Sequence, residues 1–76
     1  MKKAVVVLPT YNESENIEDM ITLILAEQEK ISDWEMFILV SDSHSPDGTG
    51  DIVKKINKVN KKVELLDVRE RGIGVG

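Results

Sequence analysis

Two short stretches of this chain are apolar at every position, and they constrain its fold more than any other feature. The stretches are Ala4–Leu8 and Met36–Val40, and the first is rich in β-branched valine. A strand with one solvent-exposed face alternates apolar and polar residues, whereas a parallel strand covered on both faces is apolar throughout. Both stretches are therefore predicted to be parallel strands of an α/β protein.

The segments that follow these strands show helical periodicity. Asn12 and Glu15 match a helix start in which each side chain binds the other residue's amide, and Pro9, which lacks an amide, is predicted to end the first strand. Apolar residues then recur at helical spacing in two segments: Ile17, Met20, Ile21, Ile24 and Leu25, and Ile52, Val53, Ile56 and Val59. The patterns predict helices near residues 14–29 and 49–60, and strands near 4–9, 35–41 and 62–68.

The order strand, helix, strand, helix, strand predicts a βαβαβ unit, half of a Rossmann-like fold. Because crossover connections are right-handed, the strands are expected in the order 3-2-1 with both helices on one face. The other face and the outer edge of the first strand are then uncovered, and 76 residues supply no further layer. We therefore expect residues 1–76 to be one truncated subdomain of a larger protein. This chain is expected to form a homo-oligomer through the exposed sheet face or the outer edge of the first strand.

Composition narrows the classes of function. Cys is absent and the formal net charge is −4, so disulfides are excluded and a basic surface for nucleic acid is not expected. The longest apolar runs are the two five-residue stretches, far shorter than the about 20 residues that span a bilayer. The chain is therefore predicted to be cytoplasmic.

Ligands of open parallel sheets bind beyond the carboxyl ends of the strands, where three loops are expected to meet. The loops are Pro9–Glu13, Ser41–Thr49 and Arg69–Gly76. Tyr11 offers a flat ring to a nucleobase, Glu13 and Asp42 offer acceptors to base or ribose, and the glycines of the third loop let amides approach a phosphate. The combination predicts a nucleotide site. No G-x-G-x-x-G follows the first strand, which disfavours NAD.

Three strings of residues after the three strands resemble those of a known family. They are Leu8-Pro9-Thr10-Tyr11-Asn12-Glu13, Asp42-Ser43-His44-Ser45-Pro46-Asp47-Gly48-Thr49 and Arg71-Gly72-Ile73-Gly74. With them the chain resembles, over essentially its whole length, the polyprenol-phosphate (dolichol-phosphate) mannose synthases, a branch of the inverting family 2 glycosyltransferases with the GT-A fold. The Ser-Pro-Asp-Gly-Thr string favours this branch over relatives that build polysaccharides from UDP-sugars.

The resemblance implies transfer of mannose from GDP-mannose to a polyprenol or dolichol phosphate at the cytosolic membrane surface, assisted by Mg²⁺ or Mn²⁺. It implies nucleotide-binding roles for Pro9, Tyr11, Glu13, Asp42 and Ser43, and a phosphate-side loop of Arg71, Gly72 and Gly74. The family's Asp-x-Asp metal motif, catalytic base and acceptor-lipid elements would follow Gly76. No catalytic or metal-binding residue is therefore assigned, and the 76-residue chain alone is expected to be inactive.

Two residues depart from the family pattern. Ser43 and His44 stand where the family has a second acid and an asparagine, so one acceptor of the donor site is lost. His44 is expected to be a solvated loop residue, and Asp47 is expected to cap the second helix rather than bind a ligand.

Two alternative functions stay open. One is a family 2 glycosyltransferase that uses a UDP-sugar, because the choice of guanine over uracil rests on the resemblance alone. The other is a nucleotide-binding or assembly module without chemistry, which is favoured by Ser43 and by the missing metal motif. An in-frame continuation of the gene that carries Asp-x-Asp favours an enzyme, whereas a natural stop after codon 76 favours the module.

Overall fold

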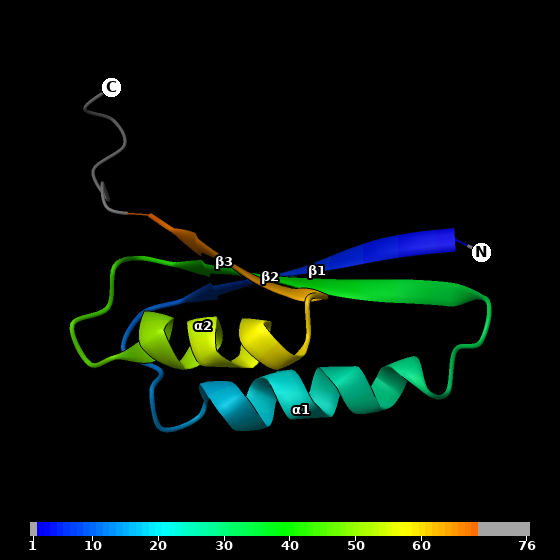
Figure 1. The fold of residues 1–76 in the computed structure, drawn as a ribbon, viewed down its shortest axis with the longest axis horizontal. Coiled ribbons are helices and arrows are strands. Elements are labelled where there is room, and N and C mark those ends of the chain that lie inside the picture. Colours follow the sequence, from blue (N-terminus) through cyan, green and yellow to red (C-terminus); the bar gives the residue numbers. More distant parts are fainter. Residues whose placement is uncertain (1, 69–76) are drawn as a thin grey trace.

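Five regular elements alternate along residues 2–68, the part of the chain that the structure, a computed structural model, describes. They are strand β1 (Lys2–Thr10), helix α1 (Ile17–Gln28), strand β2 (Trp34–Asp42), helix α2 (Thr49–Val59) and strand β3 (Val63–Asp67). The alternation confirms the predicted α/β, Rossmann-like half fold (Figure 1). Neither of these two helices is long and apolar enough to cross a membrane.

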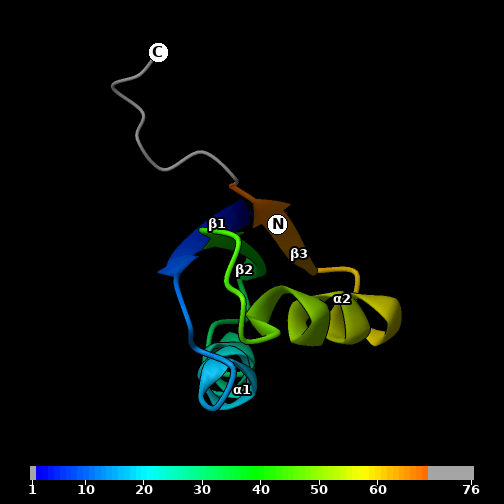
Figure 2. The same ribbon diagram turned by 90° about the vertical axis from the view of Figure 1, so that its left-hand side faces the viewer.

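The three strands form one parallel sheet in the order β1-β2-β3, which is the predicted order read from the other edge. β1 pairs with β2 from end to end, whereas β3 pairs only with the second half of β2, from Ile38 onwards. Both helices lie on the same face of the sheet, as predicted (Figure 1, Figure 2).

The hydrophobic core lies between this face and the two helices. Six buried apolar side chains form it: Ile17, Ile21, Ile38, Val40, Val53 and Val63. Together with the partly buried Ile24, Leu25, Ile52 and Ile56, the helical members recur at three- and four-residue spacing, which places them on the stripe of each helix that faces the sheet. Because burying one such side chain contributes roughly 1.5–3 kcal/mol, this layer is the main source of stability.

The opposite face of the sheet carries no element among residues 2–68. Side chains alternate between faces along a strand, so Val5, Val7 and Leu66 point to this side, where they are 60%, 56% and 50% exposed. Phe37 and Leu39 of β2 share the face, since they pair in register with Val5 and Val7. These five residues are called the bare face. It is the uncovered apolar surface that the strand patterns predict.

Gln28, the last residue of α1, compensates for the shortness of β3. Because β3 begins to pair at Ile38, the preceding backbone of β2 has no strand on that side. The Gln28 side chain lies there instead, where its amide donates to the Trp34 carbonyl oxygen and its Oε1 accepts from the Met36 amide. The end of α1 is thereby tied to the start of β2.

Two details differ from the sequence-based predictions. α1 begins at Ile17 after the N-cap residue Asn16. Asn12 has a left-handed φ of 55°, so the predicted helix start at Asn12 and Glu15 is wrong. Pro9 lies within β1 and does not end it, because an edge strand tolerates proline where the missing amide would face away from the neighbouring strand.

Candidate functional site

The carboxyl ends of the three strands meet at one edge of the sheet. Thr10, Asp42 and Asp67 end the strands and lie side by side in register. The Ser43 amide continues the ladder by donating to the Thr10 carbonyl oxygen over 3.0 Å. The predicted nucleotide-binding residues on β1, on β2 and directly after them, Pro9, Tyr11, Glu13, Asp42 and Ser43, therefore all lie at this edge. The predicted phosphate-side residues Arg71, Gly72 and Gly74 lie outside the described residues.

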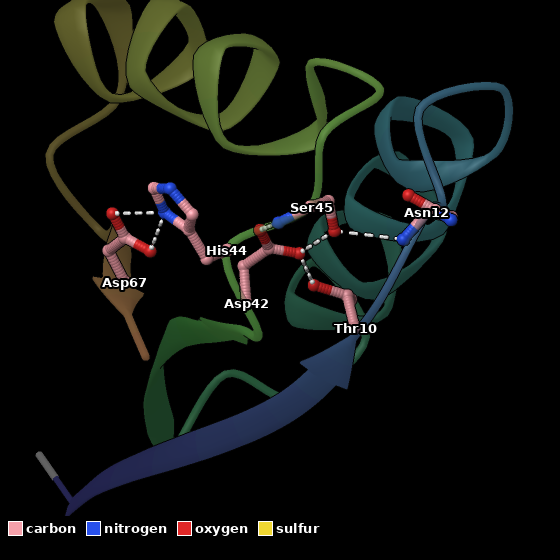
Figure 3. A network of polar contacts seen from close by, with 6 residues as sticks. All are labelled: Thr10, Asn12, Asp42, His44, Ser45 and Asp67. Atoms are coloured by element: carbon pink, nitrogen blue, oxygen red, sulfur yellow. Dashed lines mark hydrogen bonds and ion pairs between the residues drawn. The ribbon is translucent and has the colours of Figure 1, made fainter. Parts of the chain in front are cut away.

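Asp42 is only 2% exposed, and three hydrogen bonds hold its carboxylate (Figure 3). The Thr10 hydroxyl and the Ser45 hydroxyl donate to Oδ1 over 2.6 and 2.7 Å, and the Ser45 amide donates to Oδ2 over 2.8 Å. A buried carboxylate without such partners would be strongly destabilising. Asp42 therefore fastens the β2–α2 loop (residues 43–48) to the end of β1.

Side chains of the segment after β2 also bind the main chain of the β1–α1 loop (residues 11–16). Three successive amides donate to it: Asn12 to Ser45 Oγ over 2.8 Å, Glu13 to Thr49 Oγ1 over 3.0 Å, and Ser14 to Asp47 Oδ2 over 3.0 Å. Ser45, Asp47 and Thr49 are called the amide clasp. Its contacts join residues 33 or 36 positions apart, so the shape of the first loop depends on the second.

Asp47 is the charged member of the clasp. Its carboxylate accepts from the Ser14 amide and from both the amide and the hydroxyl of Thr49. These bonds, above all the one from the Thr49 hydroxyl, favour the ionised form and lower the pKa of Asp47 from 3.8 to about 2. The Thr49 amide belongs to the first turn of α2, so Asp47 supports the helix start as predicted, although the N-cap residue is Gly48.

His44 joins the β2–α2 loop to β3 on the other side. Its Nδ1 lies 3.0 and 3.2 Å from the two carboxylate oxygens of Asp67 (Figure 3). The imidazole is 59% exposed, which agrees with the prediction of a solvated loop residue. The carboxylate partner, 23 residues further along the chain, is a contact that the sequence did not indicate.

A cleft of about 260 Å³ opens beside this pair, between β3 and the start of α2. The residues that line it include Gly48, Gly50, Asp51, Lys54 and Asp67. The lining is mostly polar and carries both charges. It therefore suits a hydrophilic ligand better than an apolar one.

The remaining predicted residues differ in how accessible they are. Tyr11, which directly follows β1, is 43% exposed. Glu13 and Ser43 are half-buried, and the Glu13 carbonyl oxygen accepts from the Asn16 and Ile17 amides where α1 begins. Tyr11 and Glu13 thus belong to the clasped loop, whereas the Asp42 carboxylate is already engaged by its own chain.

Several residues that shape the site were not identified from the sequence as site residues. They are Thr10, Ser45, Thr49 and Asp67. The group of Ser45, Asp47 and Thr49 just before the second helix is a signal that could have been found, because Ser, Asp and Thr side chains often bind backbone amides in loops and at helix starts. Asp67 carries no such signal, since it is one polar residue at the end of a strand.

The described residues do not provide a metal site. Within residues 2–68, no three His, Asp or Glu side chains come together as ligands for an ion. Mg²⁺ and Mn²⁺ prefer several oxygen ligands, so the side chains at this edge do not fit the divalent ion that the family resemblance implies.

The chain is similar in sequence to known proteins. The sequence model of the family described as Glycosyl transferase family 2 matches residues 5–76. The chain is 32% identical over 65 residues to the putative teichuronic acid biosynthesis glycosyltransferase TuaG of Bacillus subtilis (strain 168), and 33% identical over 61 residues to the glycosyltransferase AglE of Haloferax volcanii. The matches cover 86% and 80% of this chain but only 24% and 19% of those proteins. No solved structure gives a significant match.

Proposed function

Because this chain belongs to glycosyl transferase family 2, we propose that residues 1–76 form the nucleotide-binding subdomain of a glycosyltransferase, which holds the nucleotide-sugar donor. One observation carries the proposal: the β1–α1 and β2–α2 loops converge at the carboxyl edge of a parallel sheet and are joined there by Asp42 and the amide clasp. Ligands of open α/β sheets bind at this edge.

Each predicted residue takes a role in the proposed site. Tyr11 stacks on the nucleobase, and Glu13 and Ser43 form hydrogen bonds with the base or the ribose. Asp42 supports these residues by holding the β2–α2 loop against the end of β1, and Pro9 contacts the nucleoside from the end of β1. The phosphate-side loop of Arg71, Gly72 and Gly74 receives the diphosphate, as the family resemblance implies.

The proposed donor is GDP-mannose, and the proposed acceptor is a polyprenol or dolichol phosphate at the cytosolic membrane surface. The support is the Ser-Pro-Asp-Gly-Thr string of residues 45–49, which resembles the mannose synthase branch. A UDP-sugar is the second candidate donor, because the choice of guanine over uracil rests on that resemblance alone.

Catalysis is proposed to require a longer chain than residues 1–76. A bound Mg²⁺ or Mn²⁺ would neutralise the diphosphate leaving group, and the described residues do not form its site. The 76-residue chain is thus proposed to bind nucleotide without turnover. The proposed location is the cytoplasm.

We also propose that the chain self-associates, as a homodimer. The bare face and the outer edge of β1 are the two surfaces that a second copy would cover. An isologous contact hides the same apolar patch on both copies, which makes a two-fold dimer the proposed form.

Titration with GDP, UDP and ADP, followed by amide chemical shifts, tests the nucleotide site. We expect weak binding, strongest for GDP, with the largest shifts at Tyr11, Glu13 and Ser43. Trp34 begins β2 at the opposite edge of the sheet and serves as an internal control. Shifts confined to the region of Trp34, or no shifts with any of the three nucleotides, would contradict the proposal.

A further inference from the structure

The amide clasp binds three consecutive residues of one loop through their backbone. The donors are the amides of residues 12, 13 and 14, and the acceptors are side chains at positions 45, 47 and 49. Tyr11 stands immediately before the clasped amides, and Glu13 is in their middle. The loop that carries the two most distinctive candidate ligand-binding side chains is therefore held along its main chain.

Two of the three acceptors are hydroxyl groups whose own proton is committed elsewhere. The Ser45 hydroxyl donates to Asp42 over 2.7 Å, and the Thr49 hydroxyl donates to Asp47. Because its proton is directed at a carboxylate, each hydroxyl presents a lone pair to the loop amide. The negative charge of the carboxylate strengthens both the bond that the hydroxyl donates and the bond that it accepts. Asp42 and Thr49 are 2% and 0% exposed, so the fold itself sets this orientation.

We propose that the amide clasp is a positioning element for the nucleotide, which fixes the conformation of the Tyr11–Glu13 loop before the ligand binds. The inference rests on the proposed function. Ser45, Asp47 and Thr49 act through the loop backbone and do not touch the ligand themselves. A loop ordered in advance loses less freedom on binding, so the affinity is higher than for the same side chains on a mobile loop.

The placement of the clasp separates this role from simple support of the fold. The contacts of Asn12 with Ser45 and of Ser14 with Asp47 are exposed, at the edge of the sheet and outside the hydrophobic core. Exposed hydrogen bonds of this kind contribute little to folding. Their loss is therefore expected to loosen the loop more than the rest of the molecule.

A pair of variants at Thr49 tests the proposal. Thr49→Val removes the hydroxyl with little change of shape, and Thr49→Ser keeps it. We expect Thr49→Val to weaken binding of GDP, measured by amide shift titration, by about fivefold or more. The Glu13 amide of the same variant should exchange its hydrogen faster than in the wild type. Thr49→Ser should bind within about twofold of the wild type.

Val53→Ala is the matched control, because Val53 is buried in the same helix and has no part in the clasp. It should lower the free energy of unfolding and leave the affinity of the folded protein within about twofold of the wild type. Equal losses of affinity in Thr49→Val and Val53→Ala would show that only overall stability matters, and would overturn the proposal.

Ser45→Ala and Asp47→Asn extend the test to the other two contacts of the clasp, and they carry it alone if Thr49→Val does not fold. Because Ser45→Ala also removes a hydrogen bond to Asp42, its free energy of unfolding is measured beside its affinity. Both variants should weaken GDP binding. Ser45→Ala should speed hydrogen exchange of the Asn12 amide, and Asp47→Asn that of the Ser14 amide. Faster exchange with unchanged affinity would overturn the proposal. A wild-type protein that binds no nucleotide would instead contradict the proposed function, so the two failures are distinguishable.

Discussion

His44 occupies a backbone conformation that most side chains avoid. Its φ of 51° lies in the left-handed region, where glycine, asparagine, aspartate and histidine are tolerated and β-branched residues are not. This accounts for histidine at a position where the resembled family has asparagine. The contact with Asp67 is largely exposed, so the backbone conformation rather than the ion pair is expected to decide which residues fit.

Substitution of His44 tests this explanation. We expect His44→Asn to change the free energy of unfolding by less than about 0.5 kcal/mol. His44→Val should lower it by about 1–2 kcal/mol, because a β-branched side chain clashes in the left-handed region. Urea unfolding of the two variants, followed by Trp34 fluorescence, gives the comparison. Equal stabilities would show that the backbone conformation at this position is not the constraint.

Asp47 links folding stability to pH. Its pKa is lowered in the folded protein from 3.8 to about 2, so the stabilisation that it contributes is fully present above pH 4 or so and is lost as the pH falls towards 2. The wild type should therefore lose stability more steeply than Asp47→Asn over this interval. Urea unfolding at a series of pH values measures both curves. A constant difference between them across the interval would contradict the assignment.

At the scale of the elements, replacing each of two glycines at the start of α2 with alanine is expected to change stability in opposite directions. Gly48 has a φ of 94° with nothing within 4 Å of an added Cβ, whereas at Gly50 an added Cβ would make ordinary contact with Leu65 at 3.5 Å. Gly48→Ala should destabilise by about 1–2 kcal/mol because of its backbone conformation. Gly50→Ala should stabilise by roughly 0.5–1 kcal/mol because alanine favours the helix. Thermal unfolding of both variants tests the contrast.

The elements could be predicted from the sequence because their signals are local. The apolar runs of β1 and β2 and the stripe that contains Ile17 and Ile21 need only neighbouring residues, and the strand order follows from the handedness of crossovers. The start of α1 could not be predicted in the same way. The Asn12 amide binds Ser45, 33 positions away, and no local pattern records that contact.

The position of the candidate site could be predicted, but not its internal contacts. Parallel topology brings the ends of β1 and β2 together, so Tyr11 and Asp42 were expected at one edge. The burial of Asp42 against Thr10 and Ser45 depends on how the loops pack. In a sequence, a carboxylate that binds a loop looks the same as one that binds a ligand.

At the scale of the whole molecule, the bare face is the surface through which we expect the chain to associate in solution. At about 25 cal/mol per Å², covering ~400 Å² of apolar surface gives on the order of 10 kcal/mol before the entropy of association is subtracted. We expect the wild type to form dimers whose population rises with concentration in sedimentation experiments. A compact monomer across a wide concentration range would contradict the prediction.

Three lysine substitutions distinguish the surfaces involved. Val7→Lys should abolish association through either the bare face or the β1 edge, whereas Leu66→Lys, on β3, should abolish only association through the face. Leu23→Lys is the control, because Leu23 is 69% exposed on α1, away from both surfaces. A loss of association in this control would show that the helical side is the interface.

The clasp also has a consequence for how such a loop can diverge. Its donors are backbone amides, which every amino acid except proline supplies. The hydrogen bonds can therefore form with most side chains at position 13 and, within the limits of a left-handed φ, at position 12. The residues proposed to face the ligand and the residues that hold their backbone lie in separate segments of the sequence. Substitutions in the first loop could therefore change the ligand specificity during evolution, one residue at a time, while Ser45, Asp47 and Thr49 stay the same.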